Sequence, residues 1–185
     1  MDAVGKPALT YGQALAEYAQ ERGDLPEVIE DLKTANVAFA QAELSGIFAN
    51  PLVPRKVKHE LIDRIFAGRT GETFRSFLHV VVERRRERLL GGIVEAALHA
   101  CLARQGIEVV FVTTPAVLPE DLREEIRLGL KKALGVEVYP EFRVNANLLG
   151  GIVIRRGDQL LDASVMGILH RLGEQMIGGV RLGQG

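Results

Sequence analysis

The spacing of apolar residues changes once along the chain, at Gly106. Before this residue, apolar side chains recur every three or four positions, as they do on one face of a helix. After it, residues 107–112 form a β-branched run in which alternate positions face opposite sides, as in a strand. The change predicts a helical domain over residues 1–105 and a mixed domain over 106–177, followed by a flexible glycine-rich tail over 178–185.

Turn signals divide the first 105 residues into several helices. Gly23 ends the first helix, and Asp24 with Glu27 three residues later resembles a capping box that begins the second. Pro51 and Pro54 interrupt the pattern, because proline lacks an amide proton and restricts the residue before it. The apolar stripes run through Tyr11, Leu15 and Tyr18; Val28, Leu32, Ala35, Phe39 and Ala42; Val57, Leu61 and Ile65; Phe74, Phe77, Leu78 and Val81; and Ile93, Ala97 and Cys101. The short connections favour a compact bundle of antiparallel helices.

The second domain is predicted to be a small mixed sheet with helices. A helix over residues 122–134 lies between two strands, so these strands should be parallel and joined by a right-handed crossover. Pro140 suits an edge strand or a bulge, because it cannot donate to a sheet ladder. Residues 157–158 predict a tight hairpin turn, and residues 165–176 predict a last amphipathic helix. The predicted fold class is therefore α+β with two domains.

Composition excludes several classes of protein. The formal net charge is -1, with 23 basic and 24 acidic residues, so the chain as a whole does not attract nucleic acid. The single cysteine, Cys101, cannot form an internal disulfide. The longest apolar stretch, residues 91–103, is shorter than the ~20 residues of a membrane-spanning helix. Residues 1–7 resemble neither a secretory signal nor a transit peptide, so we expect the protein to stay in the compartment where it is made.

Motifs for catalysis, cofactors and metals are weak or missing. Neither Gly91-Gly92 nor Gly150-Gly151 is followed by the lysine of a phosphate-binding loop. The segment His59 to Asp63 resembles a zinc-protease motif, but Asp63 replaces its second histidine. Ser164 and His170 lie six residues apart, which places them on different faces of a helix. We predict no catalytic, cofactor-binding or metal-binding residue; a hydrolase built on Ser164 and His170 is one alternative.

The segment from Glu83 to Arg88 is densely charged. Arg84 with Glu87, and Glu83 with Arg86, have the i,i+3 spacing of helical ion pairs, so the segment is interpreted mainly as a solvated helix face. The alternative is a free-standing helical adaptor or RNA-associated protein that uses the arginines at positions 84, 85, 86 and 88.

Residues 149–172 carry the most specific signal in the chain. The segments 149–158 and 161–167, with Leu169, Arg171 and Leu172, closely resemble the C-terminal signature of the ATP synthase delta subunit and oligomycin-sensitivity-conferring protein family. Segments 11–15, 50–54 and 77–86 resemble the same family in the same order. The resemblance covers essentially the whole chain.

This resemblance implies an N-terminal six-helix bundle followed by a small mixed-sheet α/β domain. It implies a non-catalytic subunit in the peripheral stalk of a rotary proton-translocating ATP synthase, at the cytoplasmic face of the bacterial plasma membrane. The implied partners are the N-terminal helix of an alpha subunit of the catalytic head and the b-type stalk subunits, with no cofactor and no nucleic acid. The groove for the alpha-subunit helix is assigned by the resemblance to Tyr11, Ala14, Leu15, Tyr18, Phe77 and Val81.

Overall fold

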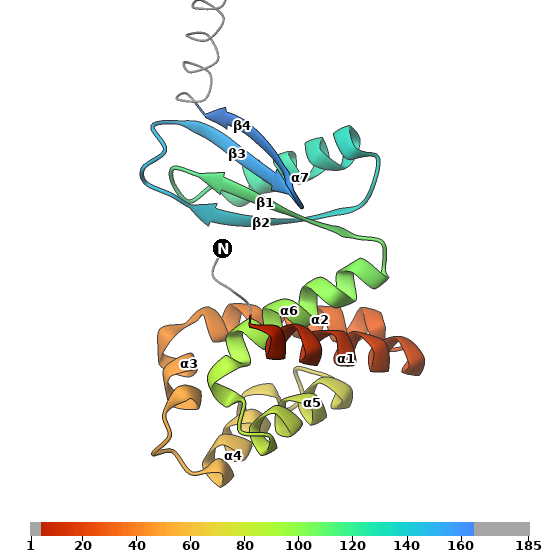
Figure 1. Ribbon diagram of the computed structural model, residues 1–185, viewed down its shortest axis with the longest axis vertical. Coiled ribbons are helices and arrows are strands. Elements are labelled where there is room, and N and C mark those ends of the chain that lie inside the picture. The colour runs from red at the N-terminus through yellow and green to blue at the C-terminus, as the bar shows by residue number, and fades with distance from the viewer. Residues whose placement is uncertain (1–4, 165–185) are drawn as a thin grey trace, which may run out of the picture. The chain divides into compact units, whose positions relative to one another are not determined.

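The computed structural model describes residues 5–164 of the 185-residue chain. The chain divides between Gln105 and Gly106 into two compact units (Figure 1). The first unit is helical and the second contains a sheet with one described helix, which confirms the α+β fold class.

The helical unit contains six α-helices and one short 3-10 helix (Figure 1). They are α1 (Lys6–Arg22), α2 (Leu25–Ala40), α3 (Ala42–Ala49), α4 (Arg55–Phe66), α5 (Glu72–Glu83), η1 (Glu87–Leu89) and α6 (Leu90–Arg104). Helix α6 is the central element: it packs on α1 and α2 and buries side chains along its whole length, from Leu90 to Leu102. A helix that is apolar on most of its surface must be enclosed by others, and this requirement organises the bundle.

One helix boundary and one helix cap differ from the sequence prediction. The predicted stripe from Val28 to Ala42 is divided between two helices, because Gln41 adopts an extended backbone (φ -74°, ψ 123°) that ends α2 and precedes α3. Asp24 does stand at the N-cap of α2, but its side chain makes no capping hydrogen bond there. Its Oδ2 instead accepts a hydrogen bond of 2.6 Å from the Thr73 hydroxyl at the start of α5. The predicted capping box is therefore wrong, and the carboxylate joins two helices.

The second unit has the order β1 (Glu108–Thr114), α7 (Glu120–Leu134), β2 (Val138–Val144), β3 (Gly151–Arg156) and β4 (Gln159–Ser164). The four strands are arranged β2-β1-β3-β4. Strands β1 and β2 are parallel, whereas β1 with β3 and β3 with β4 are antiparallel. The predicted parallel pair and hairpin are confirmed. Pro140 lies in the edge strand β2, as its missing amide proton requires.

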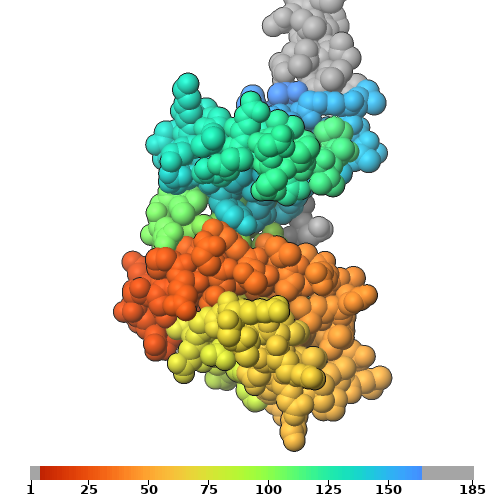
Figure 2. Space-filling model, turned by 180° about the vertical axis from the view of Figure 1, so that it is seen from behind, coloured from red at the N-terminus to blue at the C-terminus, as the bar shows by residue number. Residues whose placement is uncertain are grey.

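The core of this unit lies between the sheet and α7. Val110, Val112 and Val138 are buried there, and Ile126 and Leu130 of α7 pack against them. Seen from behind, α7 covers this face of the sheet (Figure 2). The helix predicted over residues 165–176 and the tail predicted over 178–185 lie outside the described residues.

Candidate functional site

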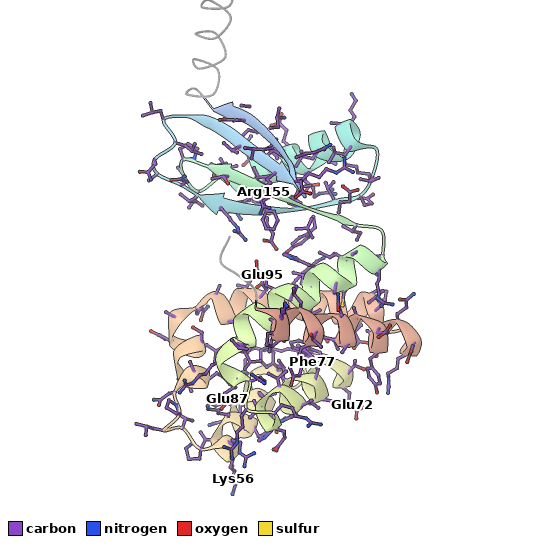
Figure 3. The ribbon with its side chains drawn as sticks, viewed as in Figure 1. Lys56, Glu72, Phe77, Glu87, Glu95 and Arg155 are labelled. Carbon is purple, nitrogen blue, oxygen red and sulfur yellow. The ribbon has the colours of Figure 1, made fainter. Side chains whose placement is uncertain are left out.

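A groove lies between α1 and α5 of the helical unit. It has a volume of about 340 Å³, and its walls come from these two helices only. The lining residues are Tyr11, Ala14, Leu15, Tyr18, Thr73, Ser76, Phe77 and Val80. Phe77 is labelled in Figure 3, on α5 below the span of α1. Most of these side chains are apolar or aromatic, so the groove can accept an apolar ligand.

The packing of the bundle explains why the groove exists. Helix α1 packs mainly on α6 and also on α2, whereas α5 packs mainly on α4 and also on α2. The two helices thus share α2 as a neighbour but each has its main contact elsewhere, so apolar residues remain along the space between them. Gly12 holds α1 against α6, because its missing side chain lets the two backbones approach closely.

The start of α5 is fixed from α2. Asp31 accepts a hydrogen bond of 2.8 Å from the backbone amide of Gly71, which precedes α5, and it is only 5% exposed. Burial raises the pKa of this carboxyl, and the Gly71 amide opposes the rise by stabilising the charged form. The bond satisfies one amide at the N-terminus of α5 and positions one wall of the groove.

The lining side chains differ in exposure in a way that suits docking. Leu15 is buried at the base, whereas Tyr18 and Val80 are 49% and 48% exposed. The Tyr18 hydroxyl accepts a hydrogen bond of 3.1 Å from Arg22 one turn later on α1, which orients the ring. A buried base with half-exposed aromatic and aliphatic rims matches the shape in which one face of an amphipathic helix can be buried.

The structure brings together five of the six residues that the sequence analysis assigned to this groove. Tyr11, Ala14, Leu15, Tyr18 and Phe77 line it, whereas Val81 is fully buried in the core of the bundle. Sequence reasoning missed Thr73, Ser76 and Val80 on the same helix. Thr73 and Val80 lie four and three residues from Phe77, and Ser76 lies three residues from Thr73 and four from Val80. This helical spacing is the signal that could have located them.

The charged segment after α5 is not the helix face that the sequence suggested. Helix α5 ends at Glu83, and Arg85 has a left-handed backbone (φ 55°). Glu83 contacts Arg55 and His59 on α4, and Glu87 binds Lys58 on α4 at 2.9 Å. The acidic residues therefore connect the segment to α4 instead of pairing with its own arginines.

The other residues singled out in the sequence occupy simple structural positions. Cys101 is fully buried on α6, and burial raises the pKa of its thiol to about 12. Asp162 lies within β4 opposite Val153, and Ser164 ends this strand. His170 lies outside the described residues. Gly151 begins β3 with a positive φ of 79°, so the glycine pair at positions 150 and 151 opens a strand.

Over residues 5–164, the helices lack the combined length and apolarity of a membrane span.

Comparisons with known proteins agree with this architecture. The family described as ATP synthase delta (OSCP) subunit matches residues 8–176. The ATP synthase subunit delta of Moorella thermoacetica is 34% identical over 174 residues, which cover 91% of this chain and 95% of the relative. The protein of the same name from Desulforamulus reducens is 33% identical, with 87% and 90% covered. A chain in the structure of the Toxoplasma gondii mitochondrial ATP synthase hexamer shares the fold with a TM-score of 0.70, at 21% identity and with 94% and 98% of the two chains covered.

These matches cover nearly the whole chain, and they agree with the six helices followed by a mixed sheet. The chain belongs to the ATP synthase delta (OSCP) subunit family and is a non-catalytic component of the peripheral stalk, which links the catalytic head of the enzyme to the stator.

Proposed function

We propose that the groove between α1 and α5 binds the amphipathic N-terminal helix of an alpha subunit in the catalytic head. The observation that carries this proposal is the apolar groove itself, which has Leu15 at its base and Tyr18 and Val80 at its rims. A helix placed there buries apolar side chains spaced three to four residues apart, and each buried methylene contributes about 0.8 kcal/mol.

The second unit binds the b-type stalk subunits in this proposal. Support comes from aliphatic side chains that are exposed on it: Leu128 on α7 is 52% exposed and Leu161 on β4 is 61% exposed. A subunit that holds one partner with each unit stays bound in the complex more tightly, because binding of the first partner raises the effective concentration of the second. Two moderate interfaces then resist the torque of the rotor. The complex lies at the cytoplasmic face of a bacterial plasma membrane.

Calorimetric titration of the full chain with a synthetic alpha-subunit N-terminal peptide from the same organism tests the groove. The wild-type chain should bind one peptide. Val80→Asp places a carboxylate at the apolar rim, and we expect it to weaken binding by more than about tenfold.

Val37→Asp is the matched control. Val37 is on α2 and is 69% exposed, and it does not line the groove, so the same substitution there should leave peptide binding unchanged. Absence of peptide binding by the folded wild-type chain would contradict the proposal. An equal effect of the two substitutions would also contradict it.

A further inference from the structure

Two histidines from different helices meet at the interface of α4 and α5. His59 on α4 and His79 on α5 have their Nδ1 atoms 2.6 Å apart. The ring centroids are 4.9 Å apart, and the ring planes are tilted by only 20°. This centroid distance equals the Nδ1–Nδ1 distance plus the radius of each ring, so both Nδ1 atoms lie on the line that joins the centroids. The two rings therefore meet edge to edge in nearly one plane, with the Nδ1 atoms pointing at each other.

The opposite nitrogen of each ring is held by a carboxylate of the other helix. The Nε2 of His59 lies 2.9 Å from Glu83 on α5, and the Nε2 of His79 lies 2.9 Å from Asp63 on α4. Both carboxylates are four residues beyond the histidine on their own helix. The arrangement is thus crosswise, and it fixes the orientation of both rings.

This pattern determines where the lone pairs lie. A carboxylate accepts hydrogen bonds, so each Nε2 is the protonated donor, and in a neutral imidazole this leaves the lone pair on Nδ1. Two lone pairs then face each other at 2.6 Å. Such a contact is repulsive unless a cation lies between the nitrogens, either a single shared proton or a metal ion.

We propose that His59 and His79 form a binding site for a divalent transition-metal ion of the zinc type. Metal-bound histidines commonly donate their other ring N–H to a carboxylate, which is the role that Glu83 and Asp63 fill here. The charges also match, because two carboxylates flank the site of a dication. Arg55 lies 3.4 Å from the outer oxygen of Glu83 and offsets part of this negative charge.

Binding of the ion requires the two rings to separate and to turn. Zinc–imidazole bonds are about 2.0–2.1 Å long, so two nitrogens on a tetrahedral ion lie about 3.3 Å apart. The Nδ1 atoms must therefore separate by less than about 1 Å from their 2.6 Å distance, and each ring must turn by about 35° so that its lone pair points at the ion. The side chains of His59 and His79 are 23% and 31% exposed, so a hydrated ion can reach them, and water can supply the remaining ligands.

The ion would connect α4 to α5, and α5 forms one wall of the groove. This inference does not depend on the proposed binding of the alpha subunit. No local motif indicates the pair, because His79 lies on another helix, 20 residues from His59.

The test is calorimetric titration of the full chain, freed of metal with a chelator, with zinc chloride. The ring nitrogens of the histidines are followed by nitrogen NMR in the same titration. We expect saturable binding of one ion, with the Nδ1 signals of His59 and His79 shifting together. His79→Gln should weaken binding by more than about tenfold, and Glu83→Gln should weaken it by about ten- to a hundredfold because Glu83 holds a ligand.

Glu60→Gln is the matched control, since Glu60 is an exposed carboxylate on α4 that has no contact with either ring in the described part of the chain. It should bind zinc as the wild type does. The proposal is overturned if zinc does not bind, or if it binds equally well to folded His79→Gln. Zinc binding that leaves both Nδ1 signals unchanged overturns it as well, and the pair then holds only a proton.

Discussion

A β-carbon added to Gly12 on α1 would lie 2.7 Å from the backbone nitrogen of Ala97 on α6. No flexible side chain can move aside there, because the atoms that it meets belong to the backbone of a central helix. Gly12 therefore sets the distance between α1 and α6, and with it the position of one wall of the groove.

Gly12→Ala should destabilise the protein despite the higher helix propensity of alanine. Overpacking costs about 1–3 kcal/mol, which exceeds the gain of up to about 1 kcal/mol from propensity. Gly92→Ala on α6 is the control, because open space surrounds that position and only the gain remains. Urea denaturation followed by circular dichroism measures both. Equal stabilisation by the two substitutions would disprove the close contact.

Asp31→Asn should make the protein more stable at neutral pH. Burial raises the pKa of Asp31, so its contribution to stability is greatest below the pKa of an unfolded aspartate and is lost as pH rises through the raised value. Asparagine stays neutral and its side-chain oxygen can still accept the bond from Gly71. The denaturation midpoints of the wild type and of Asp31→Asn, measured between pH 3 and pH 7, should therefore diverge as pH rises, and the variant should have the higher midpoint. A constant difference across this range would contradict the argument.

Glu87→Gln should destabilise the protein strongly, because it leaves the Lys58 ammonium, which is only 1% exposed, without its anionic partner. Removing one member of a buried ion pair costs about 3–5 kcal/mol. Lys58→Met combined with Glu87→Gln removes both charges and should recover most of this loss. If the double variant is no more stable than Glu87→Gln alone, the two side chains do not act as a pair.

The same pair predicts an acid-sensitive component of stability. Burial acts to raise the pKa of Glu87, but the hydrogen bond and charge of Lys58, the backbone amide of Glu87 and the charge of Arg88 together outweigh burial and hold the pKa below its usual value. Stability from this group is therefore present above the pKa of an unfolded glutamate, about 4.3, and is lost as pH falls through the lower folded value. Glu87→Gln should have a shallower decline in denaturation midpoint over this acidic range. If the midpoint of Glu87→Gln falls with pH as steeply as that of the wild type, Glu87 is not the source of the acid sensitivity.

Arg85→Gly should stabilise the protein by about 0.5–1 kcal/mol, since the left-handed backbone at φ 55° is unfavourable for a residue with a β-carbon. The neighbouring Arg84 has an ordinary backbone (φ -80°), so Arg84→Gly should instead cost about 0.5–1 kcal/mol. Both replacements remove one positive charge, so electrostatic effects are matched. Thermal denaturation of the two variants compares them directly, and a loss of stability in both would refute the prediction.

The architecture could be predicted because it rests on local patterns. The change in spacing at Gly106 separates helices from strands, and Gly23 and Pro140 mark a helix end and an edge strand. The sequence misled where a side chain had two possible partners. Asp24 could cap α2 or bind Thr73, and Glu87 could pair with Arg84 or with Lys58. Only the packing of α4 and α5 against their neighbours decides between such partners.

In the candidate sites, too, some residues could be identified from the sequence, whereas others are brought together only by the packing of helices. Most groove residues followed from the family resemblance, but periodicity alone could not decide which of Val80 and Val81 faces the core. His59 and His79 are 20 residues apart and belong to different helices, so no local motif joins them. Contacts between helices depend on the rotation of each helix about its axis, which apolar spacing defines only to within about one residue.

We propose that this chain holds the catalytic head to the stalk through the α1–α5 groove. The most direct measurement is ATP synthesis driven by a proton gradient in membranes reconstituted with the Val80→Asp chain at limiting concentration. We expect a loss of synthesis by more than about tenfold relative to Val37→Asp, with ATP hydrolysis by the head retained. Equal synthesis with the two variants would contradict it.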